Sequence, residues 1–410
     1  MPMHTEPQLS SHLHEAPPAS ERTRRIVVAI LAPAIVVTLV FLIVLWPDDV
    51  NKKSGGEDQV RAYGEVTKVV EQECPEGDPG LEDTPEGQRR CGAASVKITA
   101  GPGKGETVSV DLPNGPGAPV LHTGDDVVML FLSDAAPGEP AYTVIDHQRG
   151  KPLIWLLALA AAVIIAFGRW RGVSAIAGLA VSFAVLLVFV IPAILTGGSP
   201  LLVAVVGSAA IMFAVLYLTH GVNVHTSVAI LGTLASLLIT GLLGAGFTAF
   251  TELTGIGDEQ SAFLAVFQGN VDMRGLLLAG IIIGSLGVLD DVTVTQAMTV
   301  AELAQSPRSR LELYRSATRV GRAHVASAVN TIVLAYAGAS MPLLLLVTAG
   351  NQPINELLTS QFLAQEIVRS AVGTIGLVAS VPITTALAVL VADRGAVTPE
   401  RTTPRRQHVA

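Results

Sequence analysis

The stretch GIIIGSLGVLDDVTVTQAM, residues 280–298, decides the fold class, because two adjacent acids interrupt an otherwise apolar run. An aspartate at the centre of a membrane helix costs roughly 2.5–3.5 kcal/mol on insertion scales, so it rarely stands there without a partner or a role. Three interpretations of Asp290 and Asp291 are open. They form an intramembrane ion or proton site, they lie near the cytoplasmic end of a span among headgroup water and arginines, or they make a structural hydrogen bond between helices.

The residues around this pair are small or polar at helical spacing. Upstream, three glycines predict a face on which another helix can approach closely: Gly280, Gly284 and Gly287. Downstream, Thr295 lies one turn beyond Asp291 on the same face. Asn330, in the next apolar segment, is the partner that we expect to meet the acids, with a purely structural interhelical bond as its alternative role. The candidate residues of a transport or ion site are therefore Asp290, Asp291, Thr295 and Asn330.

The composition places the chain in the membrane class. The 410 residues are 50 % hydrophobic and 15 % charged, whereas soluble proteins are about 25 % charged. The mean hydropathy is +0.53. No basic stripe with interleaved aromatic residues is present, so the sequence does not favour nucleic acid as a partner.

Eight apolar runs are long enough to cross a bilayer core of about 30 Å. The first, residues 26–46, follows a disordered polar tail at 1–25 and is typical of a retained anchor rather than a cleaved signal. The other seven form a membrane core within residues 152–393, before a second tail at 394–410: 153–168, 173–195, 200–219, 226–250, 275–299, 325–348 and 368–392. The sequence therefore predicts a polytopic α-helical membrane protein.

The arginines predict the orientation of these spans. Positive residues gather in cytoplasmic segments, and here they flank alternate ends of the runs, while the short loops on the other side hold only Arg274 and Arg369. We therefore expect both termini to be cytoplasmic in a bacterial plasma membrane, with residues 47–151 outside. The segment 302–324, rich in arginine and with apolar residues at helical spacing, predicts an amphipathic helix on the cytoplasmic face.

Residues 47–151 are the single large polar segment. Alternating or β-branched runs separated by Gly, Pro and Asn predict five short strands: 60–70, 94–100, 106–112, 126–132 and 141–146. This spacing favours a small all-β domain, an OB-like barrel or a sandwich. The two cysteines of the chain, Cys74 and Cys91, both lie in this domain, and outside the cell we expect them to form a disulfide.

Catalytic signatures are absent from the sequence. It holds no HExxH, no GxSxG and no Walker motif, so we expect neither an enzyme nor a resident cofactor. The turn HGVNVH, residues 220–225, does not follow a metal-ligand spacing, and we expect no metal site.

Two blocks resemble the signature of the YibE/F-like bacterial membrane proteins: GIIIGSLGVLDDVTVTQAMTVAEL (280–303) and VGRAHVASAVNTIVLAYAGASMPLLLL (320–346). The stretches 220–233 and 142–157 are similar to the same family, and the resemblance covers roughly residues 55–400. It implies an extracytoplasmic N-terminal region followed by a polytopic core, with no assigned activity. The family's first block often has a single Asp, which Asp291 matches, so that Asp290 is additional.

Two functions follow as hypotheses. The first is a secondary permease or exporter of a small solute or ion that uses the intramembrane acids. The alternative is a non-transporting envelope binding, assembly or signalling protein that acts through its exported β domain. The partners expected are the lipid bilayer, the small solute or ion, and a second copy or an envelope protein. No inverted repeat is evident between the two halves of the sequence.

Overall fold

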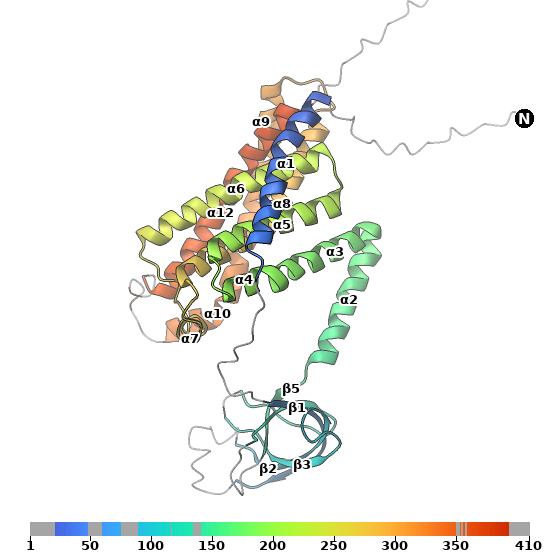
Figure 1. The fold of residues 1–410 in the computed structure, drawn as a ribbon, viewed down its shortest axis with the longest axis vertical. Coiled ribbons are helices and arrows are strands. Elements are labelled where there is room, and N and C mark those ends of the chain that lie inside the picture. Colours follow the sequence, from blue (N-terminus) through green and yellow to red (C-terminus); the bar gives the residue numbers. More distant parts are fainter. Residues whose placement is uncertain are drawn as a thin grey trace, which may run out of the picture. The chain divides into compact units, whose positions relative to one another are not determined.

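A computed structural model describes residues 21–47, 60–74, 89–115, 117–133, 141–349, 353, 356 and 359–392 (Figure 1). The chain divides into two compact units, one of residues 51–172 and the other of residues 1–50 with 173–410. The predicted tail at 394–410, and the predicted tail at 1–25 except for its last five residues, lie outside the described residues.

The first unit contains a five-stranded antiparallel sheet in the order β3-β2-β1-β4-β5. Its strands are β1 Val60–Gln72, β2 Cys91–Ala100, β3 Thr107–Asp111, β4 Asp126–Phe131 and β5 Tyr142–His147. Alternate residues point to one buried face and form its core, with Val66, Val96 and Met129 fully enclosed. The prediction of five strands in a small β domain is confirmed, and the structure shows that they pair antiparallel. The described strands belong to one sheet rather than to the two sheets of a sandwich, and the OB-like barrel stays a prediction.

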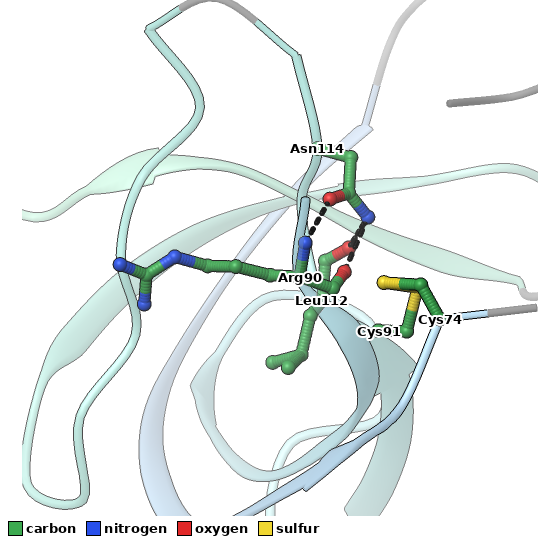
Figure 2. Close-up of a disulfide and its surroundings, with 5 residues drawn as sticks. All are labelled: Cys74, Arg90, Cys91, Leu112 and Asn114. Atoms are coloured by element: carbon green, nitrogen blue, oxygen red, sulfur yellow. Dashed lines mark hydrogen bonds between the residues drawn. A yellow bond between two sulfur atoms is a disulfide. The ribbon is translucent and has the colours of Figure 1, made fainter. Parts of the chain in front are cut away.

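A disulfide joins Cys74 to Cys91 at the start of β2, with the two Cα atoms 5.1 Å apart (Figure 2). This confirms the predicted pair. Beside it, the Asn114 side chain donates from Nδ2 to the carbonyls of Arg90, at 2.6 Å, and of Leu112, at 3.0 Å. Its Oδ1 accepts from the Arg90 N–H at 2.7 Å. The Asn114 amide therefore holds Arg90, the residue before Cys91, against the chain that follows β3.

Helices and the loops that connect them follow the sheet, beginning with α2 Gly150–Gly168 after β5. The others are α1 Glu21–Val44, α3 Trp170–Val185, α4 Ile191–Leu195, α5 Pro200–His220, α6 Val224–Phe250, α7 Glu259–Phe267, α8 Met273–Leu303, α9 Arg310–Ala339, α10 Met341–Ala349 and α12 Gln361–Val391. A π-helical turn, Leu186–Val190, connects α3 to α4. Pro192 follows this turn. Because proline has no N–H to continue the α-helical hydrogen bonds, it explains the change to π-helical pairing at this point.

Seven described helices are long and apolar enough to cross a membrane: Thr23–Val44, Gly150–Gly168, Trp170–Leu195, Pro200–His220, Val224–Phe250, Met273–Leu303 and Gln361–Val391. They agree with seven of the eight predicted spans. The exception is the span predicted at 325–348, together with the amphipathic helix predicted before it at 302–324. In their place α9 runs unbroken from Arg310 to Ala339 and α10 follows it, so the boundary predicted near residue 325 does not exist.

A capping motif in the sequence sets the start of α9, and the arginine-rich pattern of this segment drew attention away from it. Ser309 and Glu312 form a capping box, in which the Ser309 hydroxyl accepts from the Glu312 N–H and the Glu312 carboxylate accepts from the Ser309 N–H at 2.9 Å. The exposed arginines of the first half of α9 lower its mean hydropathy, although the second half is apolar.

Helices α5, α6, α8 and α12 form the core of the second unit, with α9 packed against α8 and α12 (Figure 1). A shared apolar cluster holds Met212, Ile230, Leu289 and Leu377. The helix α1 packs on it through Val27 and Leu31, so the predicted anchor is part of the bundle. At one end a second cluster gathers the start of α6, the end of α8, the start of α9 and the end of α12 through Val228, Val300, Leu313 and Ala388.

Candidate functional site

The adjacent acids occupy the middle of α8. Asp290 is partly buried, whereas the side chain of Asp291 is 74 % exposed, because neighbouring residues of a helix point about 100° apart. The Asp291 N–H donates to Oδ1 of Asp290 at 2.8 Å. One acid therefore faces the bundle, and the other faces a surface that the described chain does not cover.

His324 on α9 is the nearest charged partner of the pair. Its Nε2 lies 3.9 Å from Oδ2 of Asp291, which is within ion-pair range but too long for a hydrogen bond. This nitrogen is buried and has no hydrogen-bond partner within the described chain. The imidazole of α9 and the carboxylate of α8 therefore face each other across the contact between these two helices.

Asn330, the predicted partner of the acids, lies elsewhere. It is exposed on α9, and among the described residues no hydrogen bond joins it to Asp290 or Asp291. The sequence from His324 to Thr331 holds several polar residues, and the pattern alone does not tell which of them the register of α9 on α8 brings to the acids.

The glycines and Thr295 lie on the same uncovered face as Asp291. Along α8 the exposed positions recur at helical spacing: Gly280, Gly284, Gly287, Asp291, Thr295 and Met298. A Cβ at Gly280 or Gly287 would meet no atom of another described segment within 4 Å, and one at Gly284 would meet only the Tyr336 hydroxyl, at 3.3 Å. The described chain thus supplies no close helix to this glycine face, whose role in packing stays a prediction.

Behind the acids lies a buried hydroxyl contact that the sequence analysis did not single out. Oγ1 of Thr293 on α8 lies 2.7 Å from Oγ1 of Thr233 on α6, and both residues are fully buried. The Thr293 hydroxyl also reaches the carbonyl of Asp290, at 3.1 Å. A signal was available in hindsight: Thr293 lies three residues after Asp290, on the face opposite Asp291.

Gln296 joins three helices one turn further along α8. Its Nε2 donates to the Ala317 carbonyl on α9 at 3.0 Å and to Oγ1 of Thr385 on α12 at 2.7 Å. The residue is almost fully buried, and a Cβ at Gly321 would overlap its side chain. Gln296 therefore holds the first half of α9 in place, the half from which His324 reaches Asp291.

A second charged pair lies nearer the other end of the bundle. On α12 Arg369 Nη1 is 2.7 Å from Oε1 of Glu366, and both side chains are mostly buried. The sequence placed Arg369 at the edge of a span, whereas it is the ninth residue of α12, which begins at Gln361. This pair is internally neutral, unlike the acids of α8, which outnumber their single histidine.

Two acids, an imidazole and a line of hydroxyls suit the exchange of protons or the binding of a small cation through oxygen atoms. In the described part of the chain no three His, Cys, Asp or Glu side chains are placed to hold a metal ion together. At HGVNVH the structure shows a helix cap instead: Oδ1 of Asn223 accepts from the Thr226 N–H at 2.8 Å and starts α6.

Comparison with known proteins gives one result. The sequence model of the family described as YibE/F-like protein matches residues 156–394, more than half of the chain, and so the chain belongs to the YibE/F-like family. This confirms the family resemblance of the two signature blocks. No curated protein and no solved structure matches the chain.

Proposed function

We propose that this YibE/F-like protein is a secondary permease or exporter of a small solute or ion, coupled to protons or cations at Asp290, Asp291 and His324. The observation that supports this most is the position of the Asp291 carboxylate. It lies 74 % exposed in the middle of an apolar helix, 3.9 Å from an imidazole on a different helix.

The depth of Asp291 argues against a merely solvated helix end. It lies 12 residues before the end of α8 at Leu303, which corresponds to about 18 Å along the helix axis. The 31 residues of α8 extend about 46 Å, so with the helix centred in an apolar core of about 30 Å this carboxylate lies about 10 Å inside the core boundary. A carboxylate that far along a span faces acyl chains unless water or a partner reaches it, and the first case is what a transport path provides.

The arrangement of charge supports the proposed orientation in a bacterial plasma membrane. Five exposed arginines lie at or near the start of α9, at the end of the bundle where α1 also begins (Figure 1): Arg308, Arg310, Arg315, Arg319 and Arg322. Acids prevail in the loop between α6 and α8, at the opposite end, with Glu252, Asp258, Glu259 and Asp272. We place the arginine-rich end and both termini in the cytoplasm and the β unit outside. We do not assign the protein an enzymatic activity.

A second candidate function is recognition of an envelope ligand or protein partner through the β unit, with the helices as a scaffold. One observation favours it: the unit has its own apolar core and a disulfide, which are the features of a domain that is stable outside the cell. On this proposal the acids would be dispensable and the β unit essential.

Flux in proteoliposomes separates the two candidates. The wild type, an Asp290→Asn/Asp291→Asn variant and a Glu259→Gln control would be compared under an imposed pH gradient, with an internal pH dye and a panel of cations. Glu259 is an exposed carboxylate on α7, so its loss removes charge but not the site. The permease predicts dissipation by the wild type and the control and none by the double variant. Equal flux in all three proteins would overturn it.

A further inference from the structure

The helices α6 and α12 pack against each other through reciprocal contacts. A Cβ at Gly232 on α6 would overlap the side chain of Thr384 on α12. A Cβ at Gly376 on α12 would overlap the side chain of Thr240 on α6 in the same way. Each helix thus offers one glycine and one threonine, eight residues apart, to its neighbour. Because the order is reversed, the two helices run antiparallel.

The same two helices share a sequence pattern. When α6 is placed on α12 with a shift of 144 positions, Gly232 falls on Gly376 and Thr240 falls on Thr384. Between them GTLASLLIT (232–240) matches GLVASVPIT (376–384) at Gly, Ala, Ser, Ile and Thr. The match extends outward at helical spacing, to Val224, Val228 and Leu243 against Val368, Val372 and Leu387.

Sequence and contact therefore define one local two-fold relationship. The positions that correspond in sequence are also those that exchange places across the contact, and its centre lies at Ser236 and Ser380, both fully buried. Composition alone, in two apolar helices, would produce scattered identities, but it would not make the matched glycines and threonines meet each other. In many secondary transporters the central site lies where two inverted repeats meet, each of those repeats containing several helices.

We propose that α6 and α12 are inverted copies of one helical unit, and that the two ends of their crossing open alternately to let solute through. The proposal rests on the proposed permease function and adds its moving parts. The centre stays closed while one end separates: the end at Val228 and Ala388, or the end at Gly244 and Val372. These two pairs are equivalent under the repeat, since each lies eight residues from the central serines.

One buried group indicates that the present packing is not the sole arrangement. The Thr240 hydroxyl donates to the Ser236 carbonyl at 2.8 Å, whereas the equivalent Thr384 hydroxyl is fully buried with no partner in the described chain. An unmade hydrogen bond of this type costs roughly 1–3 kcal/mol. Pro382 lies in the same turn of α12, at the position where α6 has Leu238. Because proline has no N–H, α12 lacks one backbone hydrogen bond there that α6 can make. A different packing of α12 on α6 would give the Thr384 hydroxyl a partner.

Cysteine pairs at the two ends test the proposal in the full chain. The pairs are Val228→Cys/Ala388→Cys and Gly244→Cys/Val372→Cys. A Cβ at Gly244 would lie 3.8 Å from the Val372 side chain in ordinary contact, so this substitution fits. The control pair, Val228→Cys/Val372→Cys, uses the same positions but separates the thiols by about 24 Å along the crossing. The native cysteines are already joined, so an added oxidant acts on the new pairs.

Two measurements decide the outcome. Cross-linking yields at about pH 5 and about pH 8, which lie on either side of the ordinary histidine range, should shift in opposite directions for the two ends. Oxidation of either pair should stop flux and reductant should restore it, while the control pair keeps flux throughout. Absence of flux in the wild type would refute the permease itself. Normal flux with both ends cross-linked, or equal yields at every pH, would refute alternate opening while leaving the permease standing.

Discussion

The hydroxyls of Thr233 and Thr293 lie 2.7 Å apart in a fully buried contact between α6 and α8. The Thr293 hydroxyl also donates to the backbone carbonyl of Asp290, at 3.1 Å. The acid-bearing turn of α8 is thus tied by hydrogen bonds to α6, one of the two helices of the proposed repeat. A shift of α6 would therefore be transmitted to the turn of α8 that carries Asp290 and Asp291.

Replacing the two threonines by valine tests the strength of this tie. Each single variant, Thr233→Val or Thr293→Val, removes the contact between the two hydroxyls but leaves the remaining hydroxyl its own helix carbonyl, that of Ala229 for Thr233 and that of Asp290 for Thr293. The double variant removes both hydroxyls. Interhelical hydrogen bonds in membrane proteins average about 0.6 kcal/mol, so we expect a coupling free energy of that order in a double-mutant cycle. The measurement is thermal unfolding of the purified protein in detergent. Strictly additive effects would show that the two hydroxyls do not interact.

His324→Gln and Asn330→Ala separate the partner seen in the structure from the one expected from the sequence. Because His324 lies 3.9 Å from Asp291 and Asn330 is exposed without a bond to either acid, the first variant should lower proton-coupled flux and the second should not. A loss of at least about tenfold corresponds to about 1.4 kcal/mol of interaction. The assay is initial flux across a range of pH. A larger loss in Asn330→Ala than in His324→Gln would reverse the assignment.

The sequence predicted those features that a single element determines. The length of the apolar runs predicted seven helices that are long enough to cross a membrane, and alternation of apolar and polar residues predicted the strands. The expected export of the β domain predicted the Cys74–Cys91 disulfide. Features that depend on how two helices meet were missed, because His324 and Asn330 lie six residues apart in one polar stretch, and the sequence pattern does not say which of them faces the acids. The repeat was hidden for the same reason: its identities are spaced along apolar helices and stand out only when Gly232 is seen against Thr384.

Cys74→Ser/Cys91→Ser should destabilise the β unit selectively. The disulfide closes a loop with a sequence separation of 17 residues, and in the chain-entropy model a loop of about 15 residues contributes about 3 kcal/mol. We expect faster amide hydrogen exchange in β1 and β2 and unchanged exchange in α8, measured on the full chain. Equal exchange in the wild type and the variant would show that Asn114 and the sheet hydrogen bonds suffice to hold this region.

The pair formed by Asp146 and Arg149, at the junction between β5 and α2, predicts a pH dependence of the β unit. The hydrogen bond from Arg149 at 2.5 Å, followed by that from the His147 N–H at 2.8 Å, holds the pKa of Asp146 below its ordinary value of 3.8. A carboxyl whose pKa is lowered by folding adds stability above its unfolded pKa and loses it as the pH falls through the folded value.

The Asp146→Asn variant should therefore differ from the wild type above about pH 4 and become equivalent to it in more acidic solution. Hydrogen exchange of β4 and β5 amides, compared between the two proteins at each pH, measures this difference. Lys151→Gln is the matched control, since it removes a neighbouring ion pair with Asp126 and leaves Asp146 and Arg149 intact. If the difference between wild type and Asp146→Asn grew as the pH fell below 4, the sign of the linkage would be wrong, and the carboxyl would be stabilised in its protonated form instead.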